Sequence, residues 1–279
     1  MGNCCCGCFS SVTASVLEPC APCFLSPIVC FDASVIWRSG AKKDSKKICL
    51  TIDDFPDEKL TLDYLGDLLE LLSEYGAKAT FFTILSKIEG NPSGKQMIKM
   101  VHESGHELAV HYAGSCGCWT STDRYVEEAD NLMEKLRTIV PKARVQFVRP
   151  AGGCMHLFAV RALKDELHLR TVIGSAYPCD LLPLDCGPPS RELCTRRTLG
   201  NCAATLGKAG GRIAILHDRP QLLEIMRHFL EKAQRFDLKV CSLQEVFGSD
   251  DISDFGPSQT GLPPIYLYPP PLQNCADLP

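Results

Sequence analysis

Short apolar segments alternate with amphipathic segments along most of the chain, and this alternation constrains the fold more than any other feature. Short apolar runs predict strands, and apolar residues at helical spacing predict helices. The predicted strands cover residues 48–52, 79–84, 145–148, 171–173, 213–216 and 238–240. The predicted helices cover residues 62–75, 96–104, 157–167 and 221–236. Repeated strand–helix units predict an α/β fold with a parallel sheet, either an open doubly wound sheet or a closed barrel.

The predicted domain occupies residues 46–248, between two segments of different composition. The chain has 279 residues and is 45% hydrophobic, which is enough for one domain with a sizeable core. Residues 41–47 are polar and predict a linker into the first strand. Residues 249–279 become polar and then proline-rich, which predicts an extended, mobile tail. Docking of a proline-binding partner domain is an alternative reason for this composition.

Residues 1–45 form a cysteine-rich leader, with seven of the 17 cysteines before residue 31. The first basic residue is Arg38, so the segment lacks the early positive charge of a secretory signal. Its most apolar run, residues 24–37, is shorter than the roughly 20 residues that cross a bilayer. We therefore expect that this segment does not span a membrane.

The first residues of the leader fit a lipid anchor. Gly2, exposed after removal of Met1, fits N-myristoylation, and the adjacent cysteines fit palmitoylation. Two lipids anchor a protein stably where one does not, so the leader predicts association with the cytosolic face of a membrane. Two alternatives stay open: a leader without function in a cytoplasmic or secreted protein, or a metal or redox site that includes Cys20 and Cys23.

The charged residues argue against nucleic acid as a partner. The net charge is −4 at pH 7, and acidic and basic residues are interspersed. Binding to a phosphate backbone needs a stretch or patch of Lys and Arg, and the sequence contains no basic run of that length.

Several apolar segments end in side chains that can bind a metal or move a proton. These side chains are Asp53 with Asp54, His111, Arg149 and His217. The carboxyl ends of parallel strands meet at one edge of the sheet, where active sites of α/β folds gather. A carboxylate pair and imidazole are suited to metal binding and proton transfer, and a guanidinium can hold a carboxylate with two hydrogen bonds.

Each of these signals has an ordinary structural explanation when it is taken alone. Two aspartates close before Pro56 are also usual in turns and helix caps. A single histidine is more often a hydrogen-bonded core or surface residue than a ligand. The coincidence of all four signals at predicted strand ends favours a functional site.

Taken in order, the strings TIDD-P, ATFF, GHELxxH, RPxxG, GSAYPxD and GG…LHD resemble the polysaccharide deacetylases. This family is also called the nodulation-protein-B homology domain or carbohydrate esterase family 4. The resemblance covers roughly residues 46–248. It implies a single domain with a distorted (β/α)7 barrel, flanked here by irregular N- and C-terminal tails. It also implies metal-dependent removal of N-linked acetyl groups from an N-acetylated sugar or a chitin-like polysaccharide.

The resemblance also implies roles for individual residues. Asp53 matches the general base, His217 the general acid, and Arg149 the residue that orients Asp53. Asp180, in the string Tyr177-Pro178-Cys179-Asp180, is the candidate that holds the His217 ring. Asp218 is the competing candidate for that role.

The metal implied by the resemblance is a divalent ion, usually zinc, with cobalt, nickel or manganese as alternatives. Asp54 and His111 match two of its ligands. The third family ligand is a histidine four residues after the first, and in this chain Ser115 stands there. A neutral hydroxyl is a much poorer ligand than imidazole for a transition metal.

The serine leaves three possibilities for the site. Water completes a weak site, or a nearby side chain substitutes, the candidates being Cys116, Cys118 and His156. In the third case the chain is inactive and acts as a carbohydrate-binding or scaffolding module. Phe55 stands where the family usually has glycine, so we expect its ring to crowd or cover the pocket. His106 matches a supporting position.

Overall fold

The computed structural model describes residues 35–36, 46–113, 120–153, 155–174 and 212–248. All of them belong to the first of two compact units, which ends at Ser249. Several predicted site residues lie outside the described residues: the candidate metal ligands Ser115, Cys116 and Cys118, and also Asp180. The whole tail 249–279 lies outside them as well.

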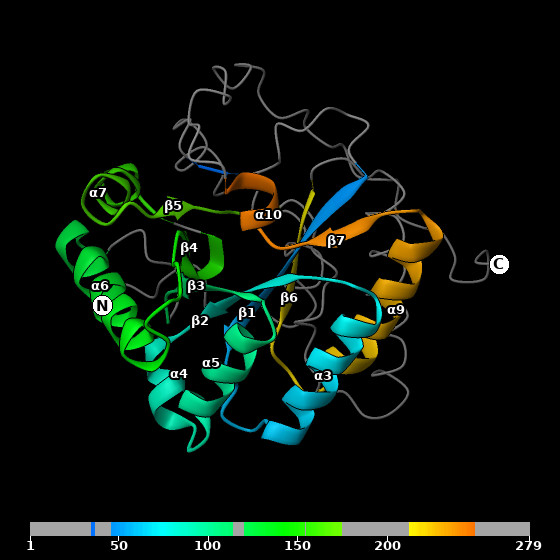
Figure 1. The fold of residues 1–279 in the computed structure, drawn as a ribbon. Helices are drawn as coiled ribbons and strands as arrows, with labels where there is room; N and C mark the ends of the chain where they lie inside the picture. The colour runs from blue at the N-terminus through cyan, green and yellow to red at the C-terminus, as the bar shows by residue number, and fades with distance from the viewer. Residues whose placement is uncertain (1–34, 37–45, 114–119, 154, 175–211, 249–279) are drawn as a thin grey trace, which may run out of the picture. The chain divides into compact units, whose positions relative to one another are not determined.

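The described residues form a seven-stranded sheet in which every neighbouring pair is parallel. The strands are β1 (Lys47–Phe55), β2 (Ala79–Thr83), β3 (Glu107–His111), β4 (Phe147–Arg149), β5 (Arg170–Thr171), β6 (Arg212–His217) and β7 (Lys239–Cys241). The strand order is β5-β4-β3-β2-β1-β6, and β7 pairs with the first residues of β1. Strand β1 therefore has three neighbours, β2, β6 and β7, which is more than any other strand of the described sheet (Figure 1).

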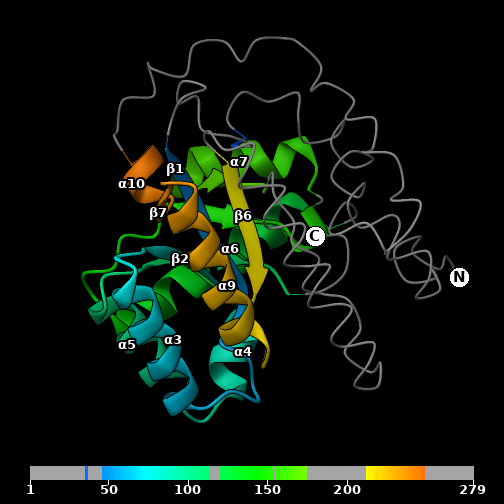
Figure 2. The same cartoon turned by 90° about the vertical axis from the view of Figure 1, so that its right-hand side faces the viewer.

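Helices follow most of the strands, as expected for repeated strand–helix units. They are α3 (Leu62–Glu74), α4 (Leu85–Gly90), α5 (Gly94–Glu103), α6 (Thr122–Ile139), α7 (Leu157–Leu167), α9 (Leu222–Arg235), α10 (Gln244–Phe247) and the short 3-10 helix η3 (Ala151–Gly153). The Thr61 hydroxyl starts α3 by accepting a hydrogen bond from the Tyr64 N–H, and Ser121 caps α6 in the same way. Figure 2 shows α9 beside β6, with α3 next to it.

The two faces of the sheet carry two separate groups of buried side chains. Along β1, Ile48, Leu50 and Ile52 belong to the larger cluster, which also contains the buried residues of α3, α5, α6 and α9. Cys49 belongs to a smaller cluster with Phe82, Ala109 and Phe147 of the neighbouring strands. Because side chains alternate along a strand, Thr51 and Asp53 point to the same inner face as Cys49. This alternation directs Asp53 toward the inside of the sheet.

The sequence predicted six strands and four helices close to their observed bounds, but it missed β3, α4, α6, α10 and η3. The segment 107–111 was expected only as an apolar stretch before His111, and the structure shows strand β3. Helix α6 was not predicted at all, because its buried residues are separated by many charged ones. Its apolar stripe contains Tyr125, Ala129, Leu132, Met133 and Leu136.

Two residues of the predicted leader pack with the domain. Val35 and Ile36 are 7% and 6% exposed, and Ile36 forms a parallel bridge with Val172, next to β5. The boundary at residue 46 stays a prediction, but the packed core includes these two residues from before it.

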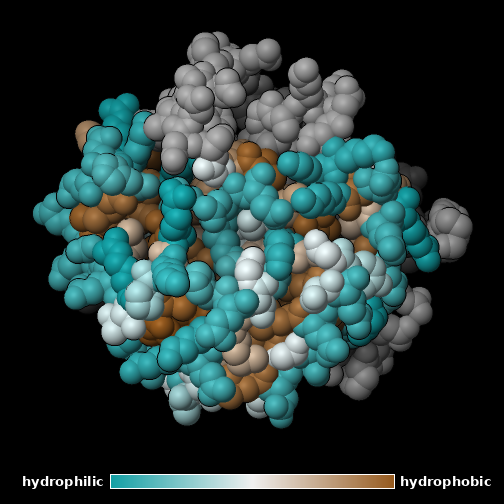
Figure 3. Space-filling model, in the orientation of Figure 1, coloured by the Kyte–Doolittle hydropathy of each residue, from teal (hydrophilic) through white to brown (hydrophobic). Residues whose placement is uncertain are grey.

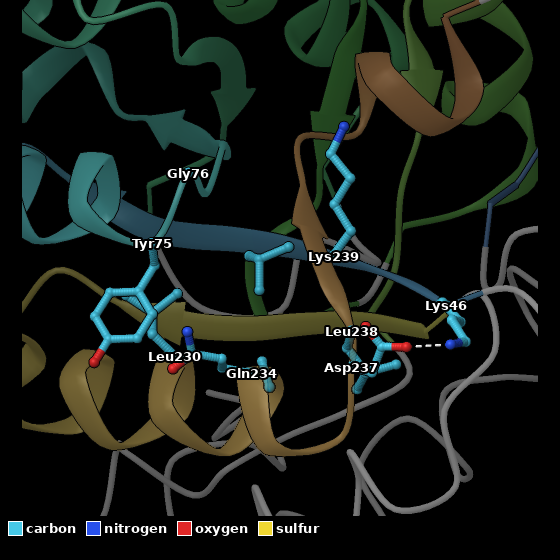
Figure 4. A pocket seen from close by; sticks show the side chains of 10 residues that line it. Lys46, Tyr75, Gly76, Leu230, Gln234, Asp237, Leu238 and Lys239 are labelled. Carbon is cyan, nitrogen blue, oxygen red and sulfur yellow. Dashed lines mark hydrogen bonds and ion pairs between the residues drawn. The ribbon is translucent and has the colours of Figure 1, made fainter.

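One hollow among the described residues lies at the opposite end of β1 from the predicted site. It has a volume of about 370 Å³ and is lined by the two residues that follow α3, by the last turns of α9 and by the start of β7 (Figure 4). These segments lie at the amino end of β1, whereas Asp53 lies near its carboxyl end. An ion pair between Lys46 and Asp237 crosses one side of the hollow.

Polar residues cover most of the face seen in Figure 3, and hydrophobic residues show between them. Among the described helices, none combines the length and the hydropathy that crossing a membrane requires.

Glu107 is a buried carboxyl group at the start of β3. Its Oε2 accepts hydrogen bonds from the Thr80 hydroxyl, at 2.6 Å, and from the Gln244 N–H, at 3.1 Å. Burial raises the pKa of Glu107 to about 7, although these hydrogen bonds act to lower it. The folded protein therefore holds this proton more tightly than the unfolded chain, so stability is lost as the pH rises through about 7.

We predict that Glu107→Gln stabilises the protein at pH 8.5 and has little effect at pH 4.5. The amide cannot ionise, so it removes a charge penalty of the order of 1–3 kcal/mol that exists only at high pH. Denaturant unfolding at both pH values measures this difference. Glu103→Gln, at an exposed site in α5, is the matched control and should show no pH-dependent gain. A Glu107→Gln variant that is equally destabilised at both pH values would contradict the prediction.

Candidate active site

Asp53 and Arg149 form a buried ion pair at the carboxyl ends of β1 and β4. Arg149 Nη1 donates to Asp53 Oδ1 at 2.5 Å and to the Thr51 hydroxyl at 2.8 Å. Both charged side chains are at most 4% exposed. The Arg149 guanidinium also lies 4.0 Å from the centre of the Phe82 ring, a cation–π contact. The geometry agrees with the predicted role of Arg149 in orienting Asp53.

His111 ends β3 and points one ring nitrogen at the two carboxylates. Its Nδ1 lies 2.9 Å from the carbonyl oxygen of Arg149. A carbonyl can only accept, so Nδ1 carries the hydrogen and the Nε2 lone pair is available. Nε2 lies 3.7 Å from Asp54 Oδ1 and 3.8 Å from Asp53 Oδ2. This orientation by a carbonyl is typical of a histidine that binds a metal.

Asp54 follows Asp53 with an unusual backbone conformation. Its φ angle is 64°, in the left-handed region that aspartate tolerates better than most residues other than glycine. Burial acts to raise the pKa of Asp54, but the nearby His111, His217 and cationic side chains together hold it below its usual value. The carboxylate is therefore ionised at neutral pH, as a metal ligand must be.

His217 ends β6 and lies in register with Asp53 on the neighbouring strand. The chain continues into Asp218, whose N–H donates to the Asp53 carbonyl at 2.8 Å. Asp218 Oδ2 accepts from the Asp57 N–H at 2.8 Å, so this oxygen holds the loop after β1. Burial raises the pKa of Asp218 to about 7. The roles proposed for Asp180 and Asp218 beside the His217 ring stay predictions.

His111 Nε2 and Asp54 Oδ1 are spaced so that both can bind one divalent ion. Ligand atoms about 2.1 Å from a tetrahedral ion lie about 3.4 Å apart, which is close to the 3.7 Å between His111 Nε2 and Asp54 Oδ1. The described part of the chain contains no group of three His, Cys, Asp or Glu side chains that suits a metal. A third ligand therefore has to come from another side chain type, from water or from outside the described residues.

Two expectations about neighbouring residues are wrong. His156 is not placed to substitute as a ligand, because Nε2 contacts the Thr120 carbonyl at 2.8 Å and Nδ1 accepts the Ala159 N–H as the cap of α7. Phe55 does not crowd the pocket. It is 1% exposed and packs edge-on against Phe81 in the core.

His106 has the supporting position that the sequence predicted. Its Nδ1 accepts the Ala79 N–H at 3.2 Å, and its ring packs edge-on against Phe81. Burial lowers the pKa of His106 to about 4, so the ring is neutral and accepts this hydrogen bond at physiological pH.

Sequence reasoning missed three charged residues around Asp54. Arg219 Nη2 lies 2.6 Å from Asp54 Oδ2, and Arg219 Nη1 lies 2.9 Å from Asp57 Oδ2. Lys87 donates to the Asp54 carbonyl at 3.0 Å and lies 3.8 Å from Asp57 Oδ2. Arg219 had a usable signal, because it comes two residues after a predicted catalytic histidine. Lys87 had none, since it lies outside every motif and every element that the sequence predicted.

The fold and the site together define an α/β protein with a curled parallel sheet and an Asp-Asp-His-Arg-His arrangement at the strand ends. The model of the polysaccharide deacetylase family matches residues 40–171. The peptidoglycan N-acetylglucosamine deacetylase of Bacillus cereus is 27% identical over 216 residues, which are 76% of this chain and 92% of that protein. Residues 40–171 therefore carry a polysaccharide deacetylase domain, the family that the sequence motifs resemble.

Solved structures confirm the predicted (β/α)7 fold. The chitin deacetylase of Colletotrichum lindemuthianum matches with a TM-score of 0.65 and 18% identity, over 78% of this chain and 93% of that one. A family 4 pseudoenzyme from Bacillus anthracis matches with a TM-score of 0.63 and 19% identity, over 77% of this chain and 69% of that one. At these identities the likeness concerns the fold alone.

We predict that Arg149→Met lowers the free energy of unfolding by about 3–5 kcal/mol, because it leaves the buried Asp53 carboxylate without its cation. Adding Asp53→Asn should restore part of this loss, since the neutral amide does not need that cation. Urea unfolding of the single and double variants measures both effects.

Arg124→Met is the matched control, because Arg124 pairs with Glu128 on the exposed face of α6. It should change stability little. If Arg149→Met changes the free energy of unfolding as little as this control does, the ion pair contributes less to stability than its burial indicates.

Proposed function

We propose that this chain is a metal-dependent hydrolase that removes N-linked acetyl groups from an N-acetylated sugar or a chitin-like polysaccharide. The observation that carries the proposal is the meeting of Asp53, Asp54 and His111 within 4 Å at one edge of the sheet, with Arg149 bound to Asp53. Residues that lie far apart in the sequence supply a base, two metal ligands and an orienting cation. The curated relatives with this family's activity, including a chitooligosaccharide deacetylase of Rhizobium leguminosarum, support the substrate class.

Asp53 is the general base in this proposal. Arg149 holds its Oδ1, so Oδ2 is left to take a proton from the attacking water, whose oxygen bonds to the acetamide carbon. His217 then gives a proton to the departing nitrogen as the C–N bond breaks. The products are acetate and a free amino sugar.

Asp54 and His111 would hold the divalent ion, and Ser115 or water would be the third ligand. We propose zinc, with cobalt, nickel or manganese as alternatives, because imidazole and carboxylate suit these ions. When bound, such an ion supplies Lewis-acid chemistry that polarises a carbonyl group and acidifies water.

We predict that the purified protein releases acetate from N-acetylglucosamine oligomers and that Asp53→Asn abolishes this release. The amide keeps the size of the side chain but cannot accept the proton. Treatment with a chelator should abolish release in the wild type, and added Zn²⁺ or Co²⁺ should restore it. Asp63→Asn, at an exposed site in the first turn of α3, is the matched control and should keep full activity.

Acetate release that persists in Asp53→Asn would overturn the mechanism. Binding of the oligomers without any release, in protein that is saturated with metal, would favour the alternative of a carbohydrate-binding or scaffolding module. Ser115 is the residue that motivates this alternative.

We also propose that the chain is attached to the cytosolic face of a membrane through a myristoyl group on Gly2 and palmitoyl groups on the adjacent cysteines. Expression in eukaryotic cells should give a membrane-bound protein, and Gly2→Ala should release it to the soluble fraction. Mass spectrometry of the N-terminal peptide checks the modification. An unmodified or shortened N-terminus in the wild type would contradict this location.

A further inference from the structure

The two oxygens of the Asp54 carboxylate have different partners. Oδ1 lies 3.7 Å from His111 Nε2, on the side where the metal would bind. Oδ2 lies 2.6 Å from Arg219 Nη2, a distance typical of a strong charge-assisted hydrogen bond. Arg219 therefore occupies the oxygen that does not face the histidine.

Arg219 is itself held at both its side chain and its backbone. Its second nitrogen, Nη1, lies 2.9 Å from Asp57 Oδ2, and its carbonyl accepts the Tyr64 hydroxyl at 2.9 Å. The Asp57 N–H is bound in turn by Asp218 Oδ2. The side chain is 32% exposed, so its fork is partly buried among these partners. These contacts give Arg219 a fixed position beside Asp54.

We propose that Arg219 is a positioning residue of the metal site, which fixes the rotation of the Asp54 carboxylate so that Oδ1 alone is offered to the ion beside His111. The inference rests on the proposed function. Rotation about the last side-chain bond of aspartate is soft, so the carboxylate needs a partner to hold one orientation. The planar guanidinium can bind Asp54 and Asp57 at the same time, which a lysine ammonium cannot do in the same geometry.

Arg219 has a second effect on the metal, and its direction is opposite. The positive charge of the Arg219 guanidinium would repel a bound ion. The ammonium of Lys87, which donates to the Asp54 carbonyl, would do the same. If charge dominated, removing Arg219 would tighten metal binding. If positioning dominates, as we propose, removing it weakens metal binding, as the loss of a group that orients a ligand does in other metal sites.

Titration of Co²⁺ into the metal-free full-length protein separates the two effects. We expect Arg219→Gln and Arg219→Lys both to bind Co²⁺ at least tenfold more weakly than the wild type, because neither retains the fork. Arg124→Gln, which removes an exposed arginine on α6, is the matched control and should bind as the wild type does. Binding in Arg219→Gln that is equal to or tighter than in the wild type would overturn the inference, as would full affinity in Arg219→Lys.

A crystal structure of metal-free Arg219→Gln gives a second test that does not depend on the ion. We expect the Asp54 carboxylate to turn away from the orientation in which Oδ1 faces His111, and an unchanged orientation would overturn the inference. This measurement decides the role of Arg219 even if the wild type binds no Co²⁺ and releases no acetate. That last result would overturn the proposed function instead.

Discussion

The ion pair between Arg149 and Asp53 is the contact on which the rest of the structure depends. Arg149 ends β4 and Asp53 lies near the end of β1, and β3 and β2 lie between them in the sheet. In a flat sheet three strand spacings are about 14 Å, which is more than one arginine side chain can span. The contact therefore requires a curled sheet. The same curl brings His111 of β3 to both carboxylates.

The site also depends on a local balance of charge. The carboxylates of Asp53, Asp54 and Asp57 lie close together, and each has a basic partner in Arg149, Arg219 or Lys87. Cations this close favour the charged form of a carboxylate and offset the repulsion between neighbouring carboxylates. The balance keeps Asp54 ionised before any metal binds. It also explains why the loops after β1 and β6 are linked, since the basic residue of one loop holds the acidic residues of the other.

The sequence predicted six of the seven described strands, four of the helices and the residues that meet at the strand ends, because each leaves a local pattern. Helix α7 was predicted with its observed bounds, and Asp53, Asp54, His111 and Arg149 meet as expected. Helix α6 was missed because charged residues interrupt its apolar stripe. His156 was a candidate metal ligand, but its ring nitrogens contact the Thr120 carbonyl and cap helix α7. The sequence does not distinguish these uses, because a helix cap and a metal ligand employ the same ring nitrogens. The contacts of Arg219 and Lys87 join residues that lie far apart in the sequence, so no sequence spacing predicts them.

The positive φ of Asp54 has a consequence for the variation that this position can accept. Consecutive residues of a strand point to opposite faces, so Asp53 and Asp54 would normally be separated by the sheet. The left-handed conformation and the irregular register between Ile52 and Phe55 break this alternation and let both carboxylates approach one imidazole. A glycine would keep the backbone and lose the ligand, whereas a branched residue would be strained. Asparagine would keep the backbone but offer only a neutral amide, so aspartate is the side chain that satisfies both demands, and the backbone itself restricts evolution at residue 54.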